Sequence, residues 1–480
     1  MSRFFLVGLL ACFLLPAFSQ EVQWANELLR YSSQYGNKSY SAEQVLGPPN
    51  ALPQYGSSKV AWAPAKEENN MIDYVWVEFE EAIHVQQIVV AENLNPGAIS
   101  KIFLFNERNR RKLVYEQEEF GGFYGPGRMF SHTMERTDYK VKSLRLELNT
   151  AAVPGMNQID AIGIADHKDP IKASINLVDY FNYKGEPENL GRAVNSRFED
   201  RLPIIAPDGR TLYFARKEQP DESGQYLSDD IFYSELGPNG QWMPAQDIGK
   251  PLNNEFHNYV AAVSTDGEEL ILANEYNRFG EEGVSVATRK KGKWSRPDAL
   301  RIKSMYNENE FSCYHMGVDG DVILLAIEQD DTYGDMDIYV SFKEEGDKWT
   351  RPLNIGPQVN TAGIEGSAFL AADGMTIYFS SNGHPGYGKM VMFMSRRLDD
   401  TWTNWSEPVN LGPKINSPQN EYNYTIPAKG DYAYFSSSNG QFGGADLFRI
   451  QLPPEVRPKP VALLKGQFID AITKKPLEVT

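Results

Sequence analysis

Five glutamates stand at nearly the same place in a repeated pattern, and carboxylates at such a spacing are suited to binding a cation or a basic peptide. If the strands that follow them lie around one axis, the glutamates form an acidic ring, with Asp200 and His257 beside it. An acidic funnel raises the local concentration of positive ligands. The five precede the glycines of five tight turns by 10, 12, 10, 9 and 9 residues, and they are Glu199, Glu255, Glu310, Glu365 and Glu421.

The same glutamates also allow a structural interpretation. A carboxylate at the start of a strand can accept hydrogen bonds from backbone N–H groups of a neighbouring repeat and lock the two repeats together. Like charges that are close repel one another, so a ring of carboxylates costs stability unless something offsets the repulsion. The sequence leaves the docking and the locking interpretations open.

Familiar catalytic patterns are missing from the sequence. The six histidines form neither HxH nor HExxH, so no zinc site is indicated. There is no GxSxG and no phosphate-binding loop, and the Gly-rich stretch from Phe120 to Arg128 precedes no predicted helix. We therefore predict that the chain is not an enzyme and that it needs no metal and no cofactor.

A repeat of about 55 residues supplies the elements that carry these glutamates. Turn glycines 58, 53, 54 and 56 residues apart each separate two predicted strands, and a third strand follows. A short four-stranded unit buries both its faces only when copies are arranged radially, as in a β-propeller. We predict five blades, with six as the alternative. A tryptophan recurs after the third strand, and we expect it to fill the space between blades: Trp242, Trp294, Trp349 and Trp405.

The last repeat stops after its third strand. The segment from Asn176 to Asn195 resembles the missing strand, so we expect it to close the ring by pairing with the last blade. Closure would leave no blade with an exposed edge. The propeller is thus predicted to span residues 176–452.

Residues 20–168 lack the repeat and have a different pattern of predicted elements. A helix is predicted from Val22 to Tyr35, and the short strands that follow it suggest a β-sandwich. Loops at the ends of such a sandwich commonly bind ligands. The alternative is that the tryptophan below is a core residue and the asparagines cap turns. The candidate glycan-binding residues are Trp62, Asn93, Asn95 and Asn157.

The two ends of the sequence and its charge point to the cell envelope. Residues 1–19 read as a secretory signal, and no later stretch has the length and hydropathy of a transmembrane helix.

The net charge of −17 argues against nucleic acid and anionic lipid as partners. Cys313 is expected to be a core residue. Residues 453–460 form a Pro-rich linker, and residues 461–480 read as the start of a further β-sandwich.

Three resemblances fit this organisation. The repeats over about 190–452 resemble the TolB-type propeller repeats of envelope proteins, although those at Gly283 and Lys389 lack the usual Asp before the third strand. VLGPPNALPQYG from Val45, AWAP from Ala61 and LRLELNTAAVPGMNQIDAIGI from Leu144 resemble a galactose-binding-like jelly roll of the discoidin type. GQFIDAITKKPL near the end is similar to the opening of a carboxypeptidase regulatory-like domain.

These resemblances imply an exported scaffold. Envelope proteins of this architecture often carry an OmpA-like domain, and some belong to type IX secretion and gliding machinery. The resemblance therefore implies a binding protein of the periplasm or outer membrane, whose partners are envelope proteins. The alternative is a surface module that binds carbohydrate through the N-terminal β-sandwich.

Overall fold

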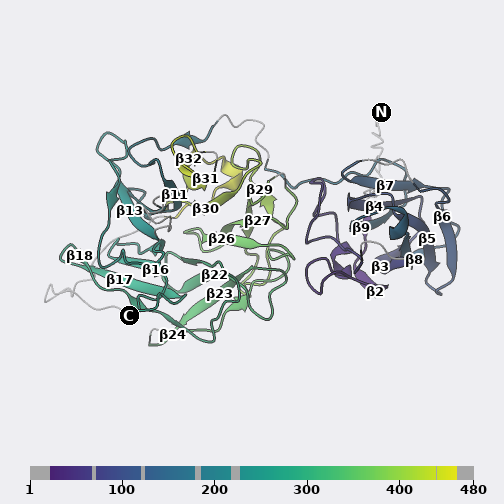
Figure 1. Cartoon of the computed structure of the whole chain (residues 1–480), viewed down its shortest axis with the longest axis horizontal. Helices are drawn as coiled ribbons and strands as arrows, with labels where there is room; N and C mark the ends of the chain where they lie inside the picture. Colours follow the sequence, from purple (N-terminus) through teal and green to yellow (C-terminus); the bar gives the residue numbers. More distant parts are fainter. Residues whose placement is uncertain are drawn as a thin grey trace, which may run out of the picture.

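The protein is an all-β molecule with two lobes, which lie side by side in Figure 1. The computed structural model describes residues 22–66, 72–120, 125–178, 185–217, 228–346, 348–386, 388–438 and 440–461. The predicted signal segment and nearly all of the predicted third domain (462–480) lie outside these residues. Helical structure in the described part is limited to three short 3₁₀ turns, at Ala42–Val45, Thr150–Ala152 and Pro454–Val456.

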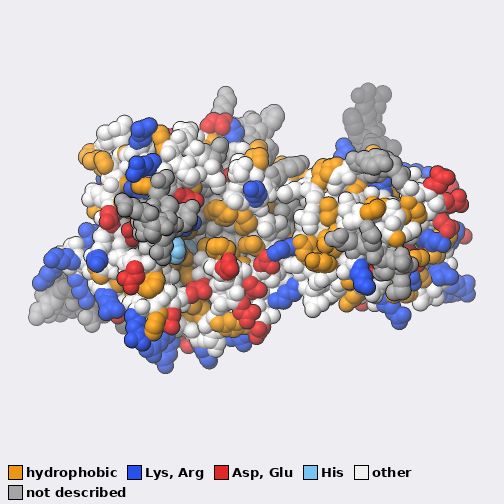
Figure 2. Space-filling model, viewed as in Figure 1, with side chains coloured by type: hydrophobic (Ala, Val, Ile, Leu, Met, Phe, Trp, Pro, Cys, Tyr) orange, Lys and Arg blue, Asp and Glu red, His pale blue; other side chains and the backbone are white. Residues whose placement is uncertain are grey.

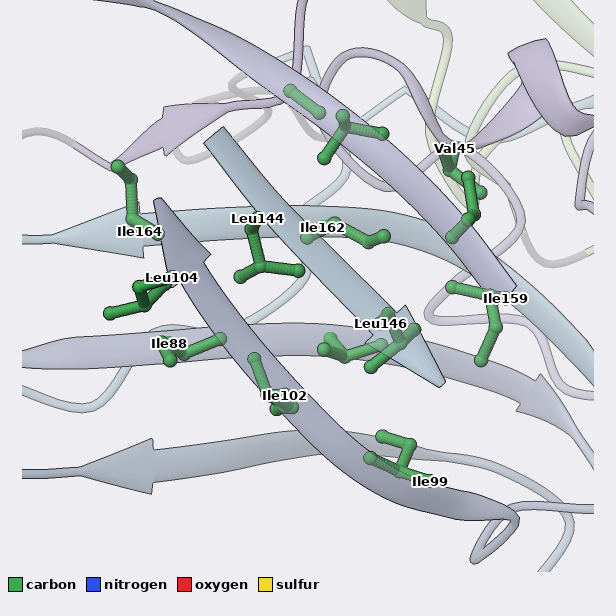
Figure 3. Packing of buried hydrophobic residues seen from close by; sticks show 14 of the residues in the cluster. Val45, Ile88, Ile99, Ile102, Leu104, Leu144, Leu146, Ile159, Ile162 and Ile164 are labelled. Carbon is green, nitrogen blue, oxygen red and sulfur yellow. The ribbon is translucent and has the colours of Figure 1, made fainter. Parts of the chain in front are cut away.

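The N-terminal lobe is a sandwich of two antiparallel sheets. One sheet has the order β1 (Gln23–Trp24), β9 (Gln158–Ala165), β4 (Gln87–Leu94) and β7 (Arg128–Thr133). The other has the order β2 (Glu27–Tyr31), β3 (Asp73–Ile83), β8 (Val141–Leu148), β5 (Ile99–Asn106) and β6 (Arg111–Glu116). Aliphatic side chains from both sheets interdigitate between them, as Figure 3 shows for Ile88, Ile102 and Leu144.

The helix predicted from Val22 to Tyr35 is wrong. This segment forms β1, which pairs with β9, and β2, which pairs with β3. The backbone N–H groups of Ala25 and Asn26 donate to one sheet each, at Ile162 and Glu78. The chain thus crosses between the two sheets here, and pairing with both of them outweighs the local helical periodicity.

The C-terminal lobe is a five-bladed propeller (Figure 1). Blade 1 holds β11 (Glu199–Ile205), β12 (Thr211–Lys217), β13 (Asp229–Glu235) and β14 (Gln246–Asp247). Blade 2 holds β15 (Val260–Val263), β16 (Glu269–Ala273), β17 (Val284–Lys290) and β19 (Asp298–Ala299), with β18 (Lys293–Trp294) on β17.

The remaining blades follow the same order. Blade 3 holds β21 (Cys313–Met316), β22 (Val322–Ile327), β23 (Asp337–Glu344) and β25 (Leu353–Asn354), with β24 (Lys348–Trp349) on β23 and β20 (Arg301–Ile302) on β24. Blade 4 holds β26 (Glu365–Leu370), β27 (Thr376–Ser381), β28 (Val391–Arg396) and β29 (Val409–Asn410). Blade 5 holds β30 (Glu421–Thr425), β31 (Tyr432–Ser437), β32 (Asp446–Gln451) and β10 (Glu188–Asn189).

The ring closes as the sequence predicts. The fourth strand of blade 5 is β10, which precedes blade 1 in the sequence and pairs antiparallel with β32. An additional parallel bridge joins Leu177 to Asn410 of blade 4. The segment before the first repeat therefore holds on to the last two blades.

One asparagine pins each of four interblade linkers to the blade that it leaves. The side-chain oxygen of Asn253 accepts the backbone N–H of Ile231 at 2.8 Å, and its amide donates to the carbonyl of Ile231 at 3.1 Å. The amide also donates to Asp247, whose carboxylate accepts the N–H of Gly249. The same pattern, with asparagine in place of Asp247, recurs around Asn195, Asn360 and Asn416.

The repeat tryptophans fill the spaces between blades, as the sequence predicts. Trp242 of blade 1 packs with Tyr434 of blade 5, with ring centroids 5.9 Å apart. Trp294, Trp349 and Trp405 each join the cluster between their own blade and the preceding one. Blade 5 has no such tryptophan. Val456 of the Pro-rich segment is fully buried between blades 4 and 5 instead, so this segment is part of the propeller core rather than only a linker.

The sandwich contacts the propeller through its loops. Lys59 forms an ion pair with Asp335, and the Ser39 hydroxyl donates to the carbonyl of Ala362 at 3.2 Å. Ala51, Val60 and Ala61 pack with Ala362 in a small buried cluster. The two lobes thus share an apolar contact as well as polar ones.

We predict that Asn360→Ala lowers the free energy of unfolding by about 2–4 kcal/mol, because it leaves a buried N–H and a buried C=O of Ile338 unpaired. Urea unfolding followed by tryptophan fluorescence measures this loss. Asn239→Ala is the control, since Asn239 is exposed in a turn and its loss should change stability by less than about 0.5 kcal/mol. Equal losses of unfolding free energy in the two variants would show that the hydrogen bonds of Asn360 do not stabilise the linker.

Candidate functional site

The two faces of the propeller differ in what they carry. On one face, which we call the linker face, the interblade linkers enter the innermost strands β11, β15, β21, β26 and β30. On the other, the turn face, these strands end in the Asp-Gly-like turns. The candidate acidic residues precede or begin the innermost strands, so they belong to the linker face.

Two of the predicted glutamates are buried caps. Glu365 and Glu421 are 0% exposed and begin β26 and β30. The carboxylate of Glu365 accepts the backbone N–H of Thr361 at 2.7 Å and the hydroxyls of Thr361 and Ser381. Glu421 accepts the same set of bonds from Ser417 and Ser437. These carboxylates hold the linker to the blade that it enters.

The other three glutamates lie elsewhere. In blade 1 the capping position belongs to Asp200, which accepts the N–H of Ser196 at 2.6 Å and pairs with Arg216. Glu199 is the residue before the cap and is partly exposed, whereas Glu255 and Glu310 are exposed on loops. The predicted ring of five equivalent carboxylates is therefore wrong, because the spacing to the turn glycine mixes capping residues with their neighbours.

An ionic cluster that the sequence analysis did not identify bridges blades 1 and 2. Asp229 is 3% exposed, and its Oδ2 accepts from Arg201 at 2.6 Å and contacts Nδ1 of His257 at 2.7 Å. Its Oδ1 has no partner among the described residues. Desolvation alone would raise the pKa of Asp229, but the hydrogen bond with His257 and the charge of Arg201 outweigh it and hold that pKa below its usual value. The only sequence signal was the doubled aspartate at the start of β13.

Exposed aromatic and acidic side chains gather on the loops of blades 2 and 3. Phe311 is 71% exposed and Phe279 is 61% exposed, on loops that also carry exposed carboxylates. Glu282 joins the loops, since it accepts from Asn307 and from the Tyr314 hydroxyl. Figure 2 shows acidic side chains over the region of β22 and β23. We call this set the acidic–aromatic surface: Phe279, Phe311, Tyr333, Glu281, Glu282, Glu308, Glu310, Asp330 and Asp331.

The central channel is narrow and mostly apolar. Two small cavities in it, lined by described residues, each have a volume of about 30 Å³. Cys313 is partly buried and lines the channel rather than packing inside a blade. Burial lowers the pKa of His315 to about 4, so this histidine is neutral between the carbonyls of Ala261 and Leu370. A ligand at the channel would meet mainly aliphatic side chains.

The predicted glycan-binding residues of the sandwich are structural. Trp62 is 0% exposed, and its indole N–H donates to the carbonyl of Ser33 at 3.0 Å. Asn93 and Asn157 are buried, and their amides donate to loop carbonyls at Gly56 and Asn95. The amide of partly exposed Asn95 donates to the carbonyl of Met156 at 2.8 Å. This corrects the glycan assignment, because the four side chains stabilise loops instead of facing a ligand.

Two kinds of feature are absent from the described residues. No group of three or more His, Cys, Asp or Glu side chains is arranged to hold a metal ion in this part of the chain. No helix within the described ranges is long and apolar enough to cross a membrane.

Parts of the sequence are similar to known proteins. The sequence family of the C-terminal SD scarf domain of pappalysin-1 matches residues 18–172. F-box/LRR-repeat protein 4 of Bos taurus is 22% identical over 197 residues, which are 34% of this chain and 32% of that protein. The chain thus spans about a third of the length of this relative.

Two solved structures resemble the chain in fold. A glycosyl hydrolase from Bacteroides ovatus aligns with 60% of this chain and 99% of its own, at 10% identity and a TM-score of 0.37. The β-propeller domain of the trilobed protease from Pyrococcus furiosus aligns with 50% of this chain and 64% of its own, at 12% identity and a TM-score of 0.26. At this identity the similarity concerns the fold alone.

The match to a glycosyl hydrolase contradicts our prediction that this chain is not an enzyme. That prediction took a β-propeller without a familiar catalytic motif to be a binding module. Since a glycosyl hydrolase is among the similar folds, the argument from missing motifs fails, and we withdraw the prediction. The match itself assigns no activity to this chain.

We predict that Glu365→Gln flattens the pH dependence of stability. Burial, and then the charge of Asp337, raise the pKa of Glu365 to about 8. Its folded-state pKa therefore lies above the unfolded value of about 4.5, so its contribution is full below pH 4.5 and is lost as pH rises to about 8. The free energy of unfolding of the variant, measured relative to wild type, should therefore rise by on the order of 3 kcal/mol from pH 5 to pH 8.5.

Thermal and urea unfolding at several pH values measures this difference. Glu310→Gln serves as the control, because it makes the same substitution at an exposed loop position. If the free energies of unfolding of wild type and Glu365→Gln change with pH in parallel, the pKa of this carboxyl is the same in the folded and unfolded states, which would contradict the prediction.

Proposed function

We propose that this chain is a binding scaffold of a bacterial cell envelope, and that it holds protein partners at the linker face of its propeller. The acidic–aromatic surface carries the proposal. Exposed aromatic rings on a protein surface mark interaction sites more often than scattered aliphatic residues do. Surrounding carboxylates favour a partner segment that carries lysine or arginine together with apolar side chains.

The charges around this surface support the choice of a basic partner. Six of its nine members are carboxylates, and Glu255 on the neighbouring linker adds another exposed one. Arg278 lies over the ring of Phe279 at 4.4 Å, an arrangement that an incoming arginine could reproduce at Phe311. The buried caps Glu365 and Glu421 take no part, so docking and locking belong to different glutamates.

The cellular setting is part of the same proposal. The signal-like start of the sequence, the TolB-type repeats and the discoidin-like sandwich together suggest export to the periplasm or the outer membrane. Partners would then be other envelope proteins, with secretion and gliding machinery as the first candidates. The sandwich contacts blades 3 and 4 through Lys59 and Ser39, so it would present its far end to a second partner.

We predict that a photo-crosslinking amino acid at Phe311, in the full chain expressed in its native envelope, forms adducts with protein partners. These adducts should weaken at about 0.5 M salt, because screening removes the attraction of the carboxylates for a basic segment. Mass spectrometry of the adducts identifies the partner.

The same crosslinker at Leu398 is the matched control, since Leu398 is 60% exposed but lies after β28 at the edge of blade 4. Adducts of equal yield at both positions would contradict a specific surface, as would adducts at Phe311 that persist in high salt. Glu310→Gln combined with Glu282→Gln should reduce the yield at Phe311 while the chain keeps its melting temperature.

A further inference from the structure

One of the five interblade linkers departs from the pattern of the other four. Between blades 2 and 3 the first pinning residue is replaced by Ala299 and the second by Tyr306. The two positions are seven residues apart here, whereas they are six apart in each of the regular linkers, such as Asp247 to Asn253. The linker therefore has one residue more and lacks the side chains that hold it against β17.

The longer linker takes a different path. Arg301 and Ile302 form β20, which pairs in parallel with Lys348 and Trp349 of β24. This pairing draws the linker toward the outer hairpin of blade 3. A cavity of about 580 Å³ lies beside it, between blades 2 and 3. This volume falls in the range of sites for small ligands, about 300–1,000 Å³.

The wall of the cavity is apolar and its rim is polar. Apolar side chains of the wall come from both blades and from the linker, and include Val263, Ile271, Leu300, Val318 and Trp349. The exposed rim carries charges of both signs, from Glu269, Asp298, Asp319, Arg301 and Lys343. The turns around Thr265 and Gly320 complete the opening, so the cavity belongs to the turn face and not to the acidic–aromatic surface.

We propose that this cavity is a binding site for a short neutral oligosaccharide. Sugar hydroxyls can donate to the three carboxylates of the rim and accept from Arg301 and Lys343, while the C–H faces of the rings pack on the apolar wall. The near balance of charges disfavours a ligand of strong single charge. A phosphate or fatty acid would approach the carboxylates of Glu269, Asp298 and Asp319, and a polycation would approach the two basic side chains.

The test uses the full chain and three neutral probes, which are maltotriose, cellotriose and N,N′,N″-triacetylchitotriose. Calorimetry and saturation-transfer NMR should detect at least one of them with a Kd below about 1 mM. Asp298→Trp places an indole at the rim and removes a carboxylate, so it should weaken that binding at least tenfold. Glu269→Gln, a smaller change at another carboxylate of the rim, should also weaken it.

Gln246→Trp is the matched control. Gln246 stands immediately before Asp247 in blade 1, as Asp298 stands before Ala299 in blade 2, and both residues are exposed. This control should bind the sugar as wild type does, and all variants should keep the wild-type melting temperature. If Asp298→Trp fails to fold, Glu269→Gln decides the question alone.

Three results would overturn the proposal. One is that none of the trisaccharides binds at about 10 mM. Another is that binding persists unchanged in both Asp298→Trp and Glu269→Gln. The third is that octanoate or inorganic phosphate binds in place of the sugars and is lost in Asp298→Trp, which would assign the cavity to an anionic ligand.

Discussion

The propeller depends on one side-chain interaction, the pairing of a buried asparagine with both backbone groups of a single residue in the preceding blade. An amide side chain carries a donor and an acceptor, so it can make the two backbone hydrogen bonds that a neighbouring strand would otherwise make. The same asparagine also donates to the residue whose side chain accepts the N–H of the turn glycine, so each pin sets the direction in which the chain enters the next blade. Four of the five interblade linkers thus have nearly the same structure, and the linker between blades 2 and 3 is the exception.

The repeat could be predicted from the sequence because its strands and turns have characteristic residue patterns. Alternating apolar residues on both sides of a tight turn predicted the blades, and the unfinished last repeat predicted that β10 completes blade 5. The tryptophans were correctly placed between blades, since an indole at the same position of each unit has few other places to go. Such features depend on local pattern, which a single sequence contains.

The candidate site was less readable because it depends on register and burial. Counting back from a turn glycine placed Glu199 in the ring, whereas the cap is its neighbour Asp200. The same count included Glu310, ten residues before its turn glycine, whereas the capping position of blade 3 lies nine residues before it and is Phe311. In the sandwich, the pattern of residues does not indicate how deeply each side chain is buried, and Trp62 and Asn93 are buried. The helix expected at Val22 failed because its residues are divided between two sheets.

Closure by β10 has a mechanical consequence. The chain that arrives from the sandwich and the chain that leaves after Gln451 are both attached to blade 5, where β10 pairs with β32 over two residues. Tension between the two lobes' outer ends would load the contacts of the sandwich with blades 3 and 4 and, within the propeller, this short pairing, the bridge at Leu177 and the buried Val456. The propeller would then respond to stretching in a graded way, in which one seam opens while four blades keep their structure.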